Sequence, residues 1–250
     1  MRISGAGTPL VLLHAFPLDA TMFAPLHETG VPGVRLITPD LAGFGESALP
    51  AAEPDLASLA ATVVGLLDEL GLERAVVGGV SMGGYVVQAL LRTAPERVAA
   101  AVLVATRHTA DAEAGRERRA AMAAQVLAEH SVEPAVSGVA HLHAPDASAD
   151  LVARAESIAR RQRPEAVAWA QRAMAARPDS GEVLRTLRIP ALVVAGEHDR
   201  VVAREESEAL AGLLRRPLDV VPRAGHLVPW EQPEAFAALL ATSLPGVTGT

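Results

Sequence analysis

Residues 76–84, Val-Val-Gly-Gly-Val-Ser-Met-Gly-Gly, place Ser81 between two glycines, Gly79 and Gly83. The valine-rich run before the serine is typical of a buried strand, and residues 85–92 after it follow a helical pattern. Glycines on both sides of a serine permit a tight bend from strand to helix, which presents the hydroxyl at the end of a sheet. The stretch therefore predicts a nucleophile elbow in which Ser81 is the nucleophile.

A nucleophilic serine needs a base that takes its proton and an acid that orients this base. Asp199 follows an apolar, strand-like segment, and His226 follows the next such segment. Functional residues of parallel sheets lie at the carboxyl ends of the strands, so we expect both side chains to lie near Ser81. In this interpretation His226 is the general base and Asp199 orients its ring. Glu197 and His198 flank Asp199 and are the alternatives at this turn.

The loop after the first apolar strand, residues 8–13, offers an oxyanion hole. It begins His-Ala-Phe-Pro, so the backbone N–H groups of Phe16 and Met82 are predicted to bind the developing oxyanion. Each such donor contributes on the order of 3 kcal/mol to the transition state. We interpret His14 chiefly as a residue that structures this loop.

Several further segments resemble the α/β-hydrolase superfamily, and the likeness covers nearly the whole chain. The resemblance lies in the oxyanion loop at 14–17, an Asp-x-x-Gly-x-Gly-x-Ser turn at 39–47, the acid turn at 196–199, and the histidine loop with a closing helix at 225–236. Within the superfamily, the oxyanion loop, the elbow and residues 173–180 are most similar to cofactor-free haloperoxidases (perhydrolases), 3-oxoadipate enol-lactonases and small carboxylesterases.

This resemblance implies hydrolysis of a small carboxylic ester or lactone through an acyl-serine, with no cofactor. A perhydrolase, a carbon–carbon bond hydrolase and an iminopeptidase share the same machinery and stay open as alternatives. A second class is a non-enzymatic small-molecule binding protein, because fold does not fix function. A haloalkane dehalogenase or epoxide hydrolase is disfavoured, since Ser81 stands where those relatives carry aspartate.

The alternation of strand and helix patterns predicts a mostly parallel sheet with helices on both faces, and the resemblance implies that this is the α/β-hydrolase fold. Residues 55–70 place leucines and a valine on one helical face, which predicts core packing. Residues 108–188 carry no strand pattern and are too long for a plain crossover. We therefore expect a helical lid at 108–188, inserted after the sixth strand of the family, between core segments 1–107 and 189–250.

The substrate pocket is expected between this lid and the strand ends. Candidate lining residues are His14, Val201, Trp169 and Met174, each of which is equally well explained by packing. An arginine of the lid, or Arg107, is a candidate for binding an anionic substrate, because guanidinium groups match carboxylates well.

Only a few residues precede the first confident strand. The antiparallel pair that opens this fold is therefore predicted to be absent or reduced to residues 2–4. Residues 34–38 would then form an exposed sheet edge, and such an edge is a template for pairing with another chain. On this basis we expect that the protein forms a homodimer.

The composition excludes several chemistries. The chain contains no lysine and no cysteine, so it has neither a Schiff-base lysine nor a thiol nucleophile. The net charge of −7 and the lack of a basic run argue against nucleic acid, and no apolar segment is long enough to predict a membrane span. His141 and His143 lack a third metal ligand nearby, so no metal site is predicted. We expect a cytoplasmic protein with a frayed end at residues 245–250.

Overall fold

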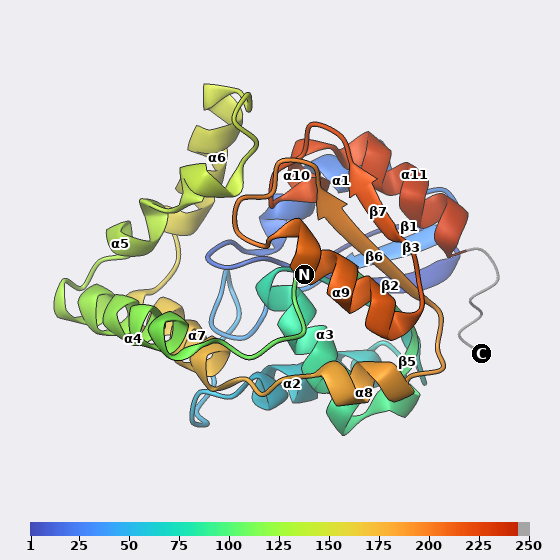
Figure 1. Cartoon of the computed structure of the whole chain (residues 1–250), viewed down its shortest axis with the longest axis horizontal. Coiled ribbons are helices and arrows are strands. Elements are labelled where there is room, and N and C mark those ends of the chain that lie inside the picture. The colour runs from blue at the N-terminus through green and yellow to red at the C-terminus, as the bar shows by residue number, and fades with distance from the viewer. Residues whose placement is uncertain (245–250) are drawn as a thin grey trace.

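The central element is a seven-stranded sheet with the strand order β1-β3-β2-β4-β5-β6-β7 (Figure 1). The structure is a computed structural model that describes residues 1–244, so the frayed end expected at 245–250 lies outside the described residues. β1 is antiparallel to β3, and every other neighbouring pair is parallel. The predicted mostly parallel sheet is thus confirmed. The strands are β1 (Arg2–Gly5), β2 (Thr8–Leu13), β3 (Val34–Thr38), β4 (Ala75–Val80), β5 (Val98–Val104), β6 (Ala191–Gly196) and β7 (Leu218–Val221).

Helices cover both faces of the sheet because alternate side chains of each strand point to opposite faces. In β2, Leu10 and Leu12 belong to one buried cluster, whereas Val11 and Leu13 belong to the other. The first cluster packs against α1 (Ala24–Thr29) and α11 (Pro233–Ser243). The second packs against the helices α2 (Leu56–Glu69), α3 (Met82–Thr93), α8 (Gly181–Thr186) and α9 (Arg204–Leu214).

Helix α2 begins and ends at residues suited to capping a helix. Asp55 caps its start by accepting a hydrogen bond from the N–H of Ala57. Gly71 follows its end with a φ of 66°, a left-handed conformation that glycine adopts without strain. The apolar face buries Leu59 and Val63 among others, so the predicted leucine stripe is core packing.

The expectation that residues 34–38 form an exposed edge is wrong. β1 pairs with β3 on the side away from β2, so the opening antiparallel element survives as one short strand. Gly5 and Gly7, with φ of 74° and 115°, carry the chain from one side of β3 to the other. Since β3 has a strand on each side, the basis for dimerisation there is removed, and the homodimer stays a prediction without a located interface.

The chain between β5 and β6 forms helices and no strand; all of its residues lie within the described part. We call the four helices that project from the sheet the insert: α4 (Glu113–Ala128), α5 (Glu133–Val136), α6 (Ala149–Arg160) and α7 (Pro164–Ala176). Figure 1 shows the insert beside the end of the sheet to which the arrowheads of β6 and β7 point. α8 does not join it, because this helix packs against α3 and α9 under the sheet.

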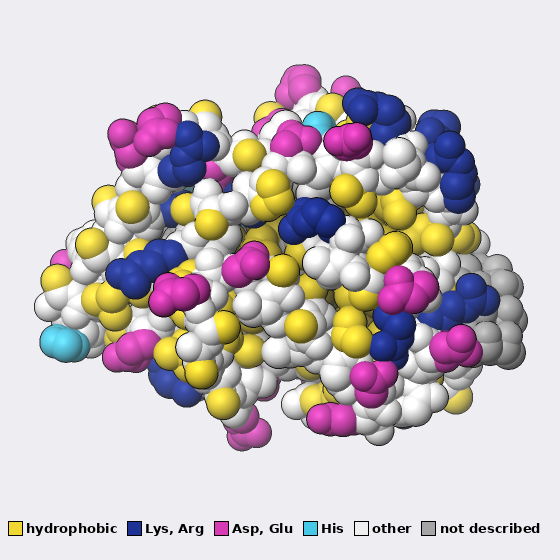
Figure 2. Space-filling view, turned by 90° about the horizontal axis from the view of Figure 1, so that it is seen from below, with side chains coloured by type: hydrophobic (Ala, Val, Ile, Leu, Met, Phe, Trp, Pro, Cys, Tyr) yellow, Lys and Arg dark blue, Asp and Glu magenta, His cyan; other side chains and the backbone are white. Residues whose placement is uncertain are grey.

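The surface of the protein is mixed in charge on the face drawn in Figure 2, where arginines and acidic side chains are interspersed. Across residues 1–244, no helix combines the length and the apolarity needed to cross a membrane.

Glycines at close backbone contacts are expected to be more important for stability than glycines in open positions. A Cβ atom at Gly196 would lie 1.9 Å from the carbonyl oxygen of Gly225, whereas one at Gly65, inside α2, would meet nothing within 4 Å. Gly196→Ala should therefore lower the free energy of unfolding by about 1 to 3 kcal/mol or more. Gly65→Ala should raise it by roughly 0.5 to 1 kcal/mol. Urea unfolding of both variants checks this, and equal effects would contradict the close approach at Gly196.

Candidate active site

Ser81 lies on a sharp bend between β4 and α3. Its backbone has φ 53° and ψ −111°, a conformation that costs energy in a non-glycine residue. A Cβ at Gly79 would lie 2.1 Å from the carbonyl carbon of Gly83, and one at Gly83 would lie 2.3 Å from the carbonyl oxygen of Leu13. Both glycines are therefore required by the bend, as expected for a nucleophile elbow.

Asp199 and His226 lie together beyond the ends of β6 and β7. The Nδ1 atom of His226 is 2.9 Å from Oδ2 of Asp199 and 3.1 Å from Oδ1. Both side chains are buried, at 1% and 3% exposure. With Nδ1 donating to the carboxylate, Nε2 of the neutral ring is left as a proton acceptor.

The carboxylate of Asp199 is kept ionised by its surroundings. Burial alone would raise the pKa of this group, but the charge and hydrogen bond of His226 and the N–H groups of Val201 and Val202 outweigh burial. The pKa of Asp199 therefore lies below its usual value. An ionised partner on Nδ1 stabilises the imidazolium that forms when the ring takes a proton.

The loop that carries His226 is held by Glu231, a residue for which sequence predicted no individual role. Its Oε1 accepts hydrogen bonds from the N–H groups of Gly225 at 3.0 Å and Leu227 at 3.2 Å. Its Oε2 accepts from the N–H of Ala144, in the chain before α6, at 2.7 Å. One carboxylate thus fixes the backbone on both sides of His226 and ties it to the residues between β5 and β6.

A cavity of about 130 Å³ joins these elements. It brings together five of the residues that the sequence singled out, which are Phe16, Ser81, Met174, Val201 and His226. Asp199 does not line the cavity itself, but it is hydrogen-bonded to His226, which does. The described residues contain no group of three or more His, Asp or Glu side chains placed to hold a metal ion.

Five more residues line the same cavity and were not predicted for it individually: Tyr85, Arg107, Arg119, Leu142 and Val202. Arg107 is a sequence-based candidate for binding an anion, and Arg119 is one of the lid arginines that are candidates for this role as a group. Tyr85 lies one turn after Ser81 on α3, so helical spacing was a usable signal for it. Arg119 and Leu142 come from α4 and from a 3₁₀ turn, Val139–Leu142, whose positions depend on long-range packing.

The two backbone amides expected to bind an oxyanion have no competing partner. The N–H of Met82 belongs to the first turn of α3, and the N–H groups of a helix's first turn have no hydrogen-bond acceptor within the helix. Within residues 1–244, neither this group nor the N–H of Phe16 donates to a backbone or side-chain acceptor. Phe16 lies at the cavity, and Met82 directly follows Ser81.

His14 and Trp169 do not line this cavity. His14 is fully buried, where its Nε2 accepts from the N–H of Leu41 at 3.0 Å and its ring packs edge-on against Phe44. Burial lowers the pKa of His14, so it holds the loop as a neutral ring. Trp169 donates its indole N–H to the carbonyl of Ala52 at 3.0 Å and packs in the core.

A buried carboxylate, Asp111, organises the arginines at the cavity. Arg177 forms a fork with it, at 2.8 Å and 2.9 Å. Arg119 Nε donates at 2.6 Å and Arg107 Nη2 at 2.5 Å, and Arg107 also pairs with Glu206 at 3.2 Å. Burial opposes the charge of Asp111, but the hydrogen bonds and charges of Arg177 and Arg119 hold its pKa well below the usual range.

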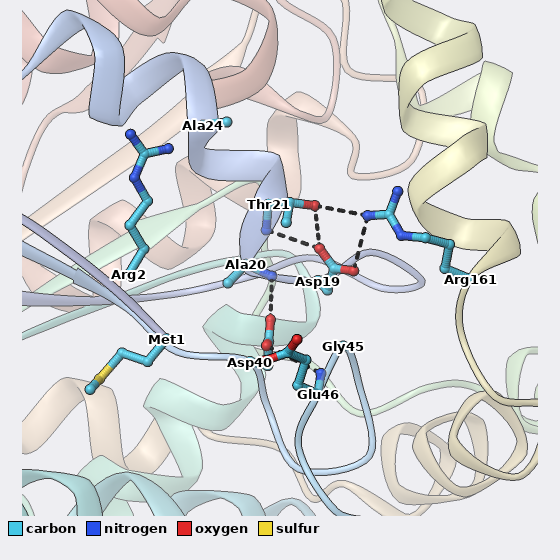
Figure 3. Close-up of a pocket in the computed structure, with 10 residues that line it drawn as sticks. All are labelled: Met1, Arg2, Asp19, Ala20, Thr21, Ala24, Asp40, Gly45, Glu46 and Arg161. Atoms are coloured by element: carbon cyan, nitrogen blue, oxygen red, sulfur yellow. Dashed lines mark hydrogen bonds and ion pairs between the residues drawn. The ribbon is translucent and has the colours of Figure 1, made fainter.

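A larger cavity, of about 490 Å³, lies elsewhere, between the N-terminal strand, the turn at residues 19–24 and the loop after β3 (Figure 3). Two of its three carboxylates, Asp40 and Asp19, already have structural partners. Asp40 accepts from the N–H of Ala20, and Asp19 accepts from Thr21 and Gln162. Because none of its lining residues lines the cavity at Ser81, we assign it no part in the site.

A family model described as alpha/beta hydrolase fold matches residues 8–233. The chain belongs to this family. The α/β-hydrolase is similar in structure to a thermophilic esterase from Thermogutta terrifontis, solved with malate bound, with a TM-score of 0.93 and 35% identity over 100% of this chain and 93% of the other.

Curated proteins that match most of this α/β-hydrolase include the following two relatives. One is the dihydrolipoyllysine-residue acetyltransferase component of the acetoin cleaving system of Pseudomonas putida, 35% identical over 91% of this chain. The chain spans only 61% of that protein's length. The other is a carboxylesterase of Bacillus subtilis, 27% identical over 90% of this chain and 76% of its own.

The ion cluster at Asp111 should be important for stability in a pH-dependent way. Asp111→Asn leaves the buried Arg177 without its counter-charge, so we expect a loss of about 3 to 5 kcal/mol in unfolding free energy at pH 7. Because the folded-state pKa is depressed, this contribution is fully present above about pH 4, the usual carboxyl value, and is lost as the pH falls toward the folded-state pKa.

Thermal unfolding of the wild type and of Asp111→Asn from pH 7 to pH 2 measures this difference, which should narrow only below about pH 4. Asp68→Asn is the control, since Asp68 is 65% exposed where it pairs with Arg97 and should contribute less than about 1 kcal/mol. Equal melting temperatures for Asp111→Asn and the wild type at pH 7 would refute the role of the cluster.

Proposed function

We propose that this α/β-hydrolase cleaves a small carboxylic ester or lactone through an acyl-serine intermediate. The observation that carries the proposal is that Ser81, on its strained bend, shares one cavity with His226, whose ring is hydrogen-bonded to Asp199. A binding protein has no need of a nucleophile, a base and an acid at one point. The esterase and carboxylesterase relatives support the same reaction class.

In the proposed cycle, Ser81 Oγ attacks the substrate carbonyl carbon while His226 Nε2 takes the hydroxyl proton. The N–H groups of Phe16 and Met82 stabilise the negative charge on the carbonyl oxygen. As the tetrahedral intermediate collapses, the carbon–oxygen bond of the leaving group breaks, and His226 gives its proton to this oxygen. Water then attacks the acyl-serine, with His226 again as base, and releases the acid and Ser81.

The size of the cavity favours a small substrate. About 130 Å³ is well below the 300 to 1,000 Å³ typical of sites for drug-sized ligands. Leu142, Met174 and Val202 supply an apolar part of the wall. Since Arg119 and Met174 come from α4 and α7, we propose that residues 108–188 contribute a lid that shapes the pocket.

Replacing the nucleophile tests the mechanism. Ser81→Ala should lower turnover of p-nitrophenyl acetate by at least about three orders of magnitude. Its free energy of unfolding should change by about 0.5 kcal/mol or less, because Ser81 is only partly buried and the substitution needs no change of backbone. A fluorophosphonate should label the wild type stoichiometrically, with peptide mapping placing the label on Ser81. Comparable ester turnover by Ser81→Ala would exclude Ser81 as the nucleophile.

Glu231 is expected to position His226. Glu231→Gln replaces one of the two acceptor oxygens by an NH₂ group that faces backbone N–H donors, so the loop around His226 should shift. A shift of about 1 Å in a catalytic group lowers rates by roughly tenfold to a hundredfold, and we expect this loss in kcat with a smaller change in KM.

The rate of fluorophosphonate labelling of Ser81 should fall in parallel, which a purely structural role away from the site would not produce. Glu234→Gln, three residues further at an exposed position of α11, is the matched control and should behave as the wild type. Unchanged kcat and labelling in Glu231→Gln would remove this positioning role.

A further inference from the structure

We propose that the substrate of this enzyme carries a carboxylate group a few atoms from the scissile carbonyl, and that Arg119, assisted by Arg107, binds it. This inference rests on the proposed ester or lactone hydrolysis at Ser81, which it narrows to a substrate class. It starts from the cavity that contains Ser81 and His226, because two arginines line that same small space.

Asp111 does not need Arg107 and Arg119 to balance its charge. The guanidinium of Arg177, only 5% exposed, already forms a two-pronged pair with both carboxylate oxygens of Asp111. The ring of Tyr85 covers Arg177 at 4.1 Å, which completes its surroundings. Arg107 and Arg119 are therefore additional positive charges.

The ion cluster around Asp111 carries an excess of positive charge. Three guanidinium groups face two carboxylates, those of Asp111 and Glu206, so the cluster keeps one net positive charge. The side chains of Arg107 and Arg119 are 26% and 21% exposed, so this charge is neither fully buried nor fully in solvent. A partly desolvated positive charge in a small cavity favours a negatively charged ligand.

Arg119 has one donor group, Nη2, that has no acceptor among residues 1–244. Arg119 uses Nε for Asp111 and Nη1 for Gln171 and the sulfur of Met174. Among residues 1–244 no acceptor meets its Nη2, which leaves this end of a fixed fork available. Asp111 and Gln171 hold the guanidinium in place, so little side-chain entropy is lost when it binds.

These features fit a carboxylate. A guanidinium edge binds a planar carboxylate through charge-assisted hydrogen bonds, and the cavity's small volume favours a compact anion linked to the ester by a short chain. The carboxylate belongs either to the acyl part or to the leaving alcohol, and the experiment has one arm for each.

The test compares esters that differ only in charge. For the acyl side, monomethyl succinate is compared with methyl levulinate, in which a methyl group replaces one carboxylate oxygen. For the alcohol side, acetoxyacetate is compared with acetoxyacetone, which differ in the same way. Acid release in a pH-stat at about pH 7.5, where a carboxyl of ordinary pKa is ionised, gives kcat and KM for each ester with the wild type.

We expect the wild type to prefer the charged ester in at least one pair. In Arg119→Gln the charged-to-neutral ratio of kcat/KM should fall roughly tenfold to a hundredfold, the range for a hydrogen bond to a charged group, and mainly through KM. Arg119→Lys should restore part of the ratio, because lysine supplies the charge without the fork.

Arg118→Gln is the matched control. It removes the same charge from the neighbouring, exposed position of α4, and its ratio should stay within about twofold of the wild type, because distant exposed charges are screened. Melting temperatures identify any variant that fails to fold. If Arg119→Gln does not fold, Arg119→Lys is compared with the wild type instead.

The outcomes separate the two proposals. If the wild type hydrolyses the neutral esters but prefers neither charged ester, or if Arg119→Gln keeps the preference, the carboxylate inference is overturned and the ester hydrolase stands. If the wild type hydrolyses none of the four esters and a fluorophosphonate does not label Ser81, the proposed function itself fails.

Discussion

The close approach of backbone to backbone at the start of α3 is the constraint on which the site depends. Gly83 has room for no side chain because the carbonyl oxygen of Leu13 lies against it. The end of β2 therefore abuts the first turn of α3, and the loop that continues from β2 carries Phe16 to the same place as Ser81. The proposed oxyanion-hole residues, Phe16 and Met82, thus lie on two elements that touch through glycine.

A second contact of the same kind holds Asp199 and His226, the proposed acid and base. Gly196, the last residue of β6, lies against the carbonyl oxygen of Gly225, just before His226. The turn with Asp199 and the loop with His226 are thereby packed backbone to backbone. Glu231 holds the loop with two hydrogen bonds and ties it to Ala144 with a third. The polar groups of the site are thus placed mainly by main-chain geometry at the carboxyl ends of parallel strands.

The features that sequence predicted are those with a local or periodic signal. The sharp bend at Ser81, the pairing of Asp199 with His226 near it, and the strand and helix alternation all follow from short patterns. The ion cluster around Asp111 does not, because its members look like ordinary solvated charges of alanine-rich helices until packing brings them together. Trp169 fits a pocket by composition, but its indole N–H bonds to the distant carbonyl of Ala52, and this turns the ring into the core. Both outcomes depend on contacts between residues far apart in the chain.

The ion cluster also joins the two ends of the insert. Arg107 and Asp111 lie where the chain leaves β5, Arg119 lies on α4, and Arg177 directly follows α7. The outgoing and returning chains are thus bound to one carboxylate beside the cavity, so these two chain segments cannot separate from each other without breaking several ion pairs at once. The same ion cluster sets both the rigidity of the insert and the charge of the cavity, so a substitution that alters one also alters the other.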